Sequence, residues 1–313
     1  MSGAPPRIAF LGTPVAAVPT LRALAALAKV DAVFCNPDRP SGRGRKLEAP
    51  PVKLAALELG LPLHQPERWK DAGTRALWEA LRIDLAIVVA YGHILPAWML
   101  DSLSLGAWNL HFSLLPRWRG AAPVNHAILA GDAETGVSLM RLTPGLDEGP
   151  VLALARRPIT IEDDAEGLLK VLAEDAATLL SAQLPAIRMG MAKPVAQREG
   201  QATSASKLSK DMAKLHPERS ALELHRQVRA LQPWPGAELA LEGSALKVGA
   251  VGRILPAQDA AGTLRWAREG AHLACGDGQA LELLQLQRPG RAMQPALQAL
   301  QPWGPSGVLK IES

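Results

Sequence analysis

Two polar side chains stand two residues apart at the end of an apolar stretch, in the string GAWNLH of residues 106–111. In a β-strand, residues i and i+2 project from the same face, so Asn109 and His111 are expected to lie side by side. An amide and an imidazole placed together can donate hydrogen bonds to one oxygen as it becomes negatively charged. The pair alone also fits an ordinary hydrogen-bonded strand end, so its interpretation depends on what accompanies it.

A carboxylate from a second segment could complete such a site. Asp147 lies in the string PGLDEGP of residues 144–150, whose glycines permit a tight backbone turn. An aspartate beside a histidine can hold the orientation of the ring and stabilise its protonated form. Asn109, His111 and Asp147 together therefore predict a site that stabilises a developing oxyanion.

No metal site accompanies these residues in the sequence. Cys35 and Cys275 lie far apart, without the spacing of a disulfide framework or a zinc site, and are expected to be buried apolar residues. The remaining histidines show no metal-ligand spacing. Ser113 lacks the flanking glycines of a nucleophile elbow, so a covalent nucleophile is not indicated either.

The elements that must position these residues follow the pattern of an α/β fold, a Rossmann-like, doubly wound, mostly parallel sheet. The continuous apolar run of residues 84–90 is typical of a central parallel strand covered on both faces. Open sheets of this kind bind ligands at the carboxyl ends of their strands, where Asn109 and His111 would lie. The first turn, Gly-Thr-Pro, lacks the glycine-rich fingerprint of a dinucleotide site, so a plain nucleotide-binding protein is a poor fit. Strands are expected over residues 7–12, 30–35, 84–90, 106–111, 136–142 and 151–160, and helices near residues 15–30, 52–59, 74–81, 122–131 and 163–187.

The character of the chain changes after the long helical pattern. Residues 191–206 are polar and aperiodic, which indicates a linker. Short alternating stretches with glycine turns follow, typical of a small β-barrel of the OB type. The predicted domains are therefore a catalytic domain over residues 1–190, a linker over 191–206 and a C-terminal β-barrel domain over 207–313.

Charge and composition narrow the class of protein. The chain has 313 residues and a net charge of +4, which fits an anionic partner but also fits an ordinary surface. Residues 36–50 read as an irregular loop, in which Arg39, Arg43, Arg45 and Lys46 form a basic run without an acidic residue. No stretch has the pattern of a signal peptide or the length of a membrane span, so a soluble, cytoplasmic protein without a membrane partner is expected.

Five strings together resemble the methionyl-tRNA formyltransferases, in the family's order and over most of the chain. They are NLHFSLLPRWRGAAP, TGVSLMRLTPGLDEGPVL, PDRPSGRGRKL, VVAYGHILP and RALQPWPG. The resemblance implies the formyltransferase fold and catalytic roles for Asn109, His111 and Asp147. It also implies that Ser113, Leu114, Leu115 and Pro116 form a folate-binding loop.

The resemblance further implies a reaction. The α-amine of methionine on charged initiator tRNA attacks the formyl carbon of the co-substrate 10-formyltetrahydrofolate, and a tetrahedral oxyanion forms. Asn109 and His111 would stabilise that oxyanion, while Asp147 would orient His111 and help remove the amine proton. The product would be N-formylmethionyl-tRNA for translation initiation, and a monomer without a metal would suffice.

The tRNA would be bound by basic residues of both domains. The resemblance implies that the basic run of residues 39–46 contacts the acceptor end, where arginines can pair with phosphates and stack on unpaired bases. Residues 207–313 hold 13 Lys and Arg against 10 Asp and Glu, a net of +3. Lys207, Lys210 and Lys214 cluster where this domain begins and are candidate phosphate contacts, although a solvated helix surface explains them equally well.

The sequence departs from the family at a few positions and leaves two alternatives open. Phe112 replaces a small residue and is expected to point away from the oxyanion, and Glu148 places a second carboxylate beside Asp147. One alternative keeps the chemistry and changes the acceptor to a small amine, such as glycinamide ribonucleotide or an amino sugar nucleotide. The other is an RNA-binding relative that has lost catalysis, against which the intact trio counts.

Overall fold

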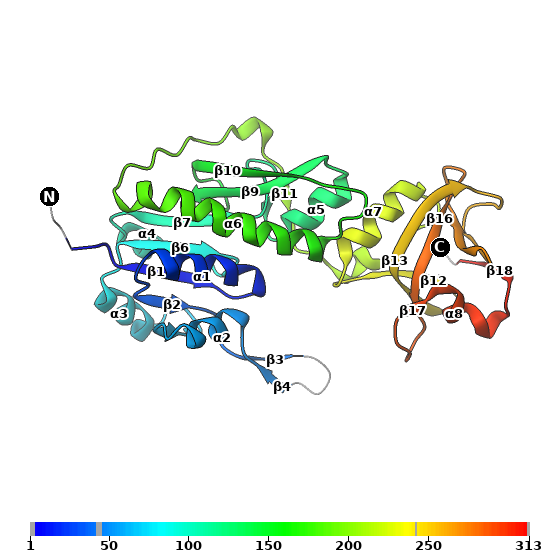
Figure 1. Ribbon diagram of the computed structural model, residues 1–313, viewed down its shortest axis with the longest axis horizontal. Coiled ribbons are helices and arrows are strands. Elements are labelled where there is room, and N and C mark those ends of the chain that lie inside the picture. The colour runs from blue at the N-terminus through cyan, green and yellow to red at the C-terminus, as the bar shows by residue number, and fades with distance from the viewer. Residues whose placement is uncertain (1–3, 42–45, 242, 312–313) are drawn as a thin grey trace. The chain divides into compact units, whose positions relative to one another are not determined.

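The structure, a computed structural model, describes residues 4–41, 46–241 and 243–311 (Figure 1). The chain forms two compact units. The first comprises Met1–Pro123, Glu134–Pro158 and Leu169–Ala205, and the second comprises Val124–Ala133, Ile159–Leu168 and Ser206–Ser313. Among the described residues, no helix combines the length and apolar character needed to cross a membrane.

A seven-stranded sheet forms the centre of the first unit and confirms the predicted mostly parallel α/β fold. Its strands are β1 (Ile8–Gly12), β2 (Ala32–Phe34), β5 (Leu63–His64), β6 (Leu85–Val89), β7 (Gly106–His111), β9 (Glu134–Arg141) and β10 (Val151–Pro158). Their order is β10-β9-β7-β6-β1-β2-β5. The strands from β7 to β5 pair in parallel, and β9 and β10 add an antiparallel edge beside β7.

Alternating apolar residues bury both faces of this sheet. Ala9 and Leu11 of β1 face the same side as Ala107 of β7, where they pack with Trp78 and Met99 from two covering helices. The opposite face is crossed by α1 and α6 (Figure 1). The helices and 3-10 turns of this part of the chain are η1 (Val15–Ala17), α1 (Val18–Leu27), α2 (Pro51–Glu58), α3 (Ala72–Leu81), α4 (Ala97–Asp101), α6 (Ala165–Arg188) and η2 (Glu199–Gln201).

The segment predicted as an irregular loop is partly structured, which corrects that expectation. Its two described ends, β3 (Arg39–Ser41) and β4 (Lys46–Glu48), pair as an antiparallel hairpin. The hairpin is anchored at its base, where Nζ of Lys53 lies 2.7 Å from Oδ2 of Asp38. Prolines and glycines had masked the strands, because such short pairs have no hydrophobic period.

The second unit is built on a seven-stranded antiparallel sheet, which agrees with the predicted OB-like domain. The strands are β12 (Ala237–Leu241), β13 (Ser244–Pro256), β14 (Thr263–Ala267), β15 (Gly270–Ala274), β16 (Gln279–Gln287), β17 (Gln294–Pro295) and β18 (Gly307–Lys310). Register shifts along β13 curl the sheet around a leucine-rich core. The helices and 3-10 turns are α5 (Pro123–Ala130), η3 (Lys210–Ala213), α7 (Ala221–Leu231), α8 (Ala296–Leu300) and η4 (Gln301–Trp303).

Helix α7 carries a buried histidine. The side chain of Ser220 caps the helix by accepting a hydrogen bond from the backbone N–H of Glu223. His225 is only 4% exposed, and its Nδ1 accepts a hydrogen bond of 3.1 Å from Nε of Arg229. Burial lowers the pKa of His225 to about 4, and the neighbouring Arg229 and Arg226 add to that shift. The ring is therefore neutral in the folded chain at neutral pH.

Acidification should weaken the second unit through this histidine. Because the pKa is lower in the folded chain than the ordinary 6.5, protons bind the unfolded state first. The free energy of unfolding should therefore fall as the pH drops below 6.5, by about 2 kcal/mol between pH 7 and pH 5. Urea unfolding, monitored by the hydrogen exchange of the α7 amides, would measure this change in the free energy of unfolding. His225→Gln should flatten the pH dependence, whereas replacing the half-exposed His216 by Gln should not; equal slopes in His225→Gln and wild type would contradict the assignment.

Candidate active site

Asn109 and His111 lie on one face of β7, as predicted. β7 runs between β6 and β9, and the alternation that buries Ala107 among the core residues carries Asn109 and His111 to the carboxyl end of the same face. Asn109 is partly exposed, whereas His111 is only 6% exposed. The intervening Leu110 is buried on the other face. The strand thus holds one accessible amide next to a nearly buried imidazole.

The His111 ring has a defined partner on each nitrogen. Nε2 lies 2.8 Å from the backbone carbonyl oxygen of Trp118, and since a carbonyl only accepts, Nε2 carries a proton and donates it. Nδ1 lies 3.6 Å from Oδ2 of Asp147. Nδ1 therefore faces a carboxylate, and a proton on Nδ1 would complete an ion pair. The carboxylate and the Trp118 carbonyl together fix the orientation of the ring.

Asp147 is held in an uncommon backbone conformation. Its φ is +49°, in the left-handed region, where aspartate is tolerated better than most residues. Its Oδ2 accepts a hydrogen bond of 2.9 Å from the backbone N–H of Gly120 and is the same atom that faces His111. The carboxylate is thus held between His111 of β7 and the backbone of Gly120. The tight turn predicted from residues 144–150 is therefore present, although its left-handed residue is the aspartate.

The loop of residues 113–116 is shaped by two buried hydroxyls. Ser113 is fully buried, and its Oγ donates to the carbonyl of Arg117 at 2.6 Å. Ser138, also buried, donates to the carbonyl of Ser113 and accepts from the backbone N–H of Leu115. Leu115 is buried as well, whereas Leu114 and Pro116 remain partly exposed. Ser113 therefore maintains the shape of the loop, in which Leu114 and Pro116 remain accessible.

Residues 195–205, which we call the strap, pack against this site within the first unit. The sequence pattern predicts these residues only as part of the linker. Gln197 donates to the carbonyls of Asp147 and Gly149, and Thr203 accepts from the backbone N–H of Trp118. Periodicity could not reveal these residues, because an extended polar strap that bonds to distant segments has no local repeat.

The charged residues near the site include both signs. The carboxylate of Glu199, which accepts from Arg119, raises the pKa of that guanidinium, and Glu148 and Asp147 add to the effect. Arg117 stacks its guanidinium over the Trp118 ring at 4.4 Å. Phe112 is 7% exposed and directly follows the last residue of β7.

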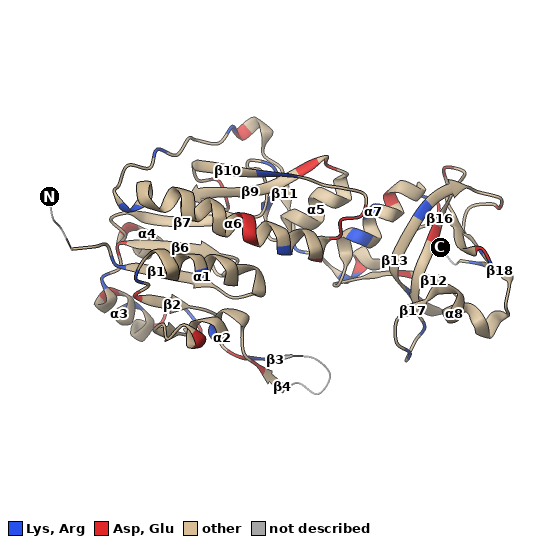
Figure 2. Cartoon of the chain, viewed as in Figure 1, with Lys and Arg blue, Asp and Glu red and all other residues tan. Residues whose placement is uncertain are grey.

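The basic residues predicted to bind tRNA are only partly described. Arg39 is exposed in β3 and Lys46 begins β4, while Arg43 and Arg45 lie outside the described residues. Lys207 and Lys210 are exposed in the second unit. Both α6 and α7 carry charged residues of both signs (Figure 2). The charge pattern by itself therefore singles out no continuous basic surface on these two helices.

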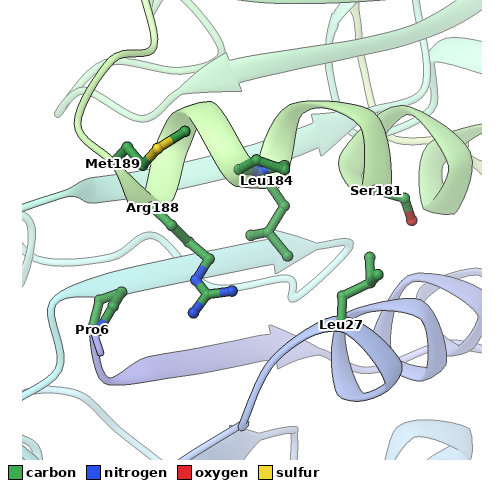
Figure 3. A pocket seen from close by; sticks show the side chains of 7 residues that line it. Pro6, Leu27, Ser181, Leu184, Arg188 and Met189 are labelled. Atoms are coloured by element: carbon green, nitrogen blue, oxygen red, sulfur yellow. The ribbon is translucent and has the colours of Figure 1, made fainter. Parts of the chain in front are cut away.

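One cavity and the two cysteines lie apart from the site. A shallow cavity of about 410 Å³ is lined by Leu184, Arg188 and Met189 at the end of α6 together with Pro6, which precedes β1 (Figure 3). It therefore opens at the amino ends of the strands, opposite the edge that carries His111. The free thiols are buried, as expected, and burial raises the pKa of both Cys35 and Cys275 to about 11. Across the described ranges, no three His, Cys, Asp or Glu side chains gather as a metal site.

The sequence matches two family models. Residues 7–184 match the model described as "Formyl transferase", and residues 207–302 match "Formyl transferase, C-terminal domain". The chain is 49% identical to a methionyl-tRNA formyltransferase of Stenotrophomonas maltophilia, over 91% of this chain and 93% of that protein. It is 44% identical to a methionyl-tRNA formyltransferase of Paracoccus denitrificans, over 94% of this chain and 96% of that protein.

Solved structures share the fold at low identity. An N-formyltransferase from Helicobacter canadensis, in complex with folinic acid and dTDP-3-aminofucose, superposes with a TM-score of 0.68 at 17% identity, covering 88% of this chain and 98% of that chain. HypX from Aquifex aeolicus in complex with tetrahydrofolic acid gives a TM-score of 0.63 at 17% identity, covering 96% of this chain and 48% of that chain. These two likenesses establish the fold alone.

Proposed function

The chain belongs to the methionyl-tRNA formyltransferases, and from this membership we propose that it transfers the formyl group of 10-formyltetrahydrofolate to the α-amine of methionine on initiator tRNA. The observation that carries the proposal is the site on β7, where His111 meets Asp147 at 3.6 Å beside Asn109. The identity of 44–49% over more than nine-tenths of the chain favours a tRNA acceptor over a small amine. The presence of Asn109, His111 and Asp147 together argues against an inactive RNA-binding relative.

In this proposal, the three side chains act by electrostatics on a tetrahedral intermediate. The methionine amine attacks the formyl carbon, and the carbonyl oxygen becomes negative. The bond between the formyl carbon and N10 then breaks, and N10 of the tetrahydrofolate leaves with the proton that the amine has lost. The amide of Asn109 and Nε2–H of His111 donate to that oxyanion. The oxyanion competes successfully with the neutral Trp118 carbonyl for Nε2–H, because a charged acceptor forms a stronger hydrogen bond.

Asp147 supports the same step in two ways. Its carboxylate faces Nδ1 of His111, where it stabilises the doubly protonated ring. It also takes part in removing the proton that the amine loses, through a water molecule. Its bond to the Gly120 N–H keeps the carboxylate in place during this exchange. The chemistry needs neither a metal nor a covalent enzyme intermediate.

We assign the folate contact to the loop after β7, and tRNA binding to the basic residues of both regions. Leu114 and Pro116, which are partly exposed, would touch the folate, whereas the buried Ser113 and Leu115 would support them from inside. The tRNA would meet the basic run of residues 39–46 and, in the region 207–313, Lys207 and Lys210. Catalysis belongs to residues 1–190. The enzyme would act as a monomer in the cytoplasm, where charged tRNA and folates meet.

A transfer assay with competing acceptors tests this function. The purified chain receives 10-formyltetrahydrofolate together with methionyl initiator tRNA, methionyl elongator tRNA, free methionine, glycinamide ribonucleotide or an amino sugar nucleotide. Formylation of initiator tRNA alone is the expected result, and Asn109→Ala should reduce it about 100-fold. Transfer to one of the small amines instead would replace the proposed acceptor. Binding of tRNA without any transfer would favour the inactive relative.

A further inference from the structure

The strap of residues 195–205 is joined to the first unit by backbone pairing at both ends. At its start, Val195 and Val151 exchange two backbone hydrogen bonds of 2.8 Å each. At its end, β11 (Ser204–Ala205) pairs in parallel with β8 (Arg119–Gly120). Gly120 has a φ of +121°, and a Cβ there would lie 2.5 Å from the carbonyl oxygen of Ala205. The strap is therefore held against the chain that contacts both Asp147 and His111.

Gln197 uses its whole hydrogen-bonding capacity on this site. Its Nε2 donates to the carbonyls of Asp147 and Gly149, each at 2.7 Å. Its Oε1 accepts from Nε and Nη2 of Arg119 at 3.0 and 2.9 Å. An amide offers two donors and two acceptor sites, so this side chain is saturated. The side chain of Gln197 thus links the turn at Asp147 to β8.

The turn that Gln197 grips has little room to relax. Asp147 has a positive φ, which strains a residue with a Cβ and persists only where the surroundings hold it. A Cβ at Gly149 would lie 1.9 Å from the carbonyl oxygen of Arg141, so the chain is tightly packed there. Asp147 is thus fixed at two points, by Gly120 at its carboxylate and by Gln197 at its carbonyl.

The same strap fixes the other partner of His111. Trp118 donates its backbone N–H to Oγ1 of Thr203 at 2.9 Å, and its carbonyl accepts from Nε2 of His111. Thr203 also bonds through its backbone, donating to Pro116 and accepting from Arg119. Both nitrogens of the His111 ring therefore face groups whose positions depend on the strap.

We propose that Gln197 is a positioning residue for formyl transfer, which sets the distance between the Asp147 carboxylate and the His111 ring through the carbonyls that it binds. The inference rests on the proposed function for its kinetic consequence, but its geometric content is independent of the substrate. Gln197 touches no reacting atom and acts through Asp147.

The discriminating variant is Gln197→Glu. A glutamate keeps the length and still accepts from Arg119, but its carboxylate cannot donate to the carbonyls of Asp147 and Gly149. We expect kcat for formyl transfer to fall about 100-fold, as for a displacement of about 1 Å in a catalytic group, with KM for folate and tRNA unchanged. Hydrogen exchange of the Gly120 amide should become faster, because its acceptor on Asp147 is no longer held. Gln201→Ala, which alters an exposed glutamine of the same strap, should change neither quantity.

The outcomes separate this inference from the proposed function. A wild-type kcat in Gln197→Glu would overturn the positioning role. So would a fall in kcat that comes with a loss of folded protein and a rise in KM. If the wild-type chain transfers no formyl group, the proposed function fails, and Gly120 exchange then decides the inference alone. Unchanged exchange in Gln197→Glu would overturn it, and faster exchange with an unchanged melting temperature would support it.

Discussion

Replacing Asp147 by asparagine is expected to lower kcat for formyl transfer by about 10³-fold while leaving the fold and the affinity for tRNA unchanged. Asparagine has nearly the same shape. Its amide oxygen can take the place of Oδ2, where it still accepts from the Gly120 N–H and faces Nδ1 of His111. The variant therefore keeps the bond to Gly120 and removes the negative charge beside His111. The lost rate measures what the carboxylate does for the charged ring and the departing amine proton.

Single-turnover rates at saturating folate and tRNA would measure this effect on the chemical step. Glu148→Gln is a matched control, because it removes the neighbouring, exposed carboxylate that departs from the family pattern. We expect that control to keep most of the wild-type rate. A near-normal rate in Asp147→Asn would show that the carboxylate does not act in the transfer.

His111→Ala is expected to lower kcat by about 10³-fold, because it removes one donor to the oxyanion together with the group that Asp147 stabilises. The Trp118 carbonyl also loses its donor, so some loss of stability should accompany the loss of rate. Binding of tRNA should remain nearly normal, since no contact with the tRNA is assigned to this ring. Rates and tRNA binding would be measured on the same folded preparation.

Two comparisons make the His111 result specific. His126→Ala removes a partly exposed histidine from α5 and should leave the rate close to wild type. Combining His111→Ala with Asp147→Asn should cost little more than either change alone, because the two side chains act as one unit. Full additivity in this double-mutant cycle would contradict the coupling inferred from their 3.6 Å approach.

Much of the fold was predictable, because it follows from short-range patterns. Continuous apolar runs predicted β1 and β6, and the register of β7 follows from alternation, which buries Leu110 and turns Asn109 and His111 to one face. The antiparallel strands of the second unit were likewise indicated by their alternation and glycine turns. Where a side chain's direction depends only on its own strand, spacing in the sequence is enough.

Other features depend on contacts between distant segments and had no sequence pattern to reveal them. The hairpin of β3 and β4 was expected as a loop. The second compact unit also includes residues 124–133 and 159–168, which come from earlier parts of the chain. Segment grouping reflects long-range contacts, and composition along the chain reports these only indirectly.

Local patterns in the chain were enough to predict the class of fold, the shared face of Asn109 and His111, and the family through its motifs. Only the tertiary structure brought Asp147 to His111 across 36 positions of the chain and placed Gln197 behind it, 50 positions further on. Gly120 and Trp118 supply backbone atoms to these contacts, and a backbone N–H or carbonyl is the same in every sequence. Hydrogen bonds to such backbone groups depend on the path of the chain in three dimensions, and no residue type in the sequence predicts them.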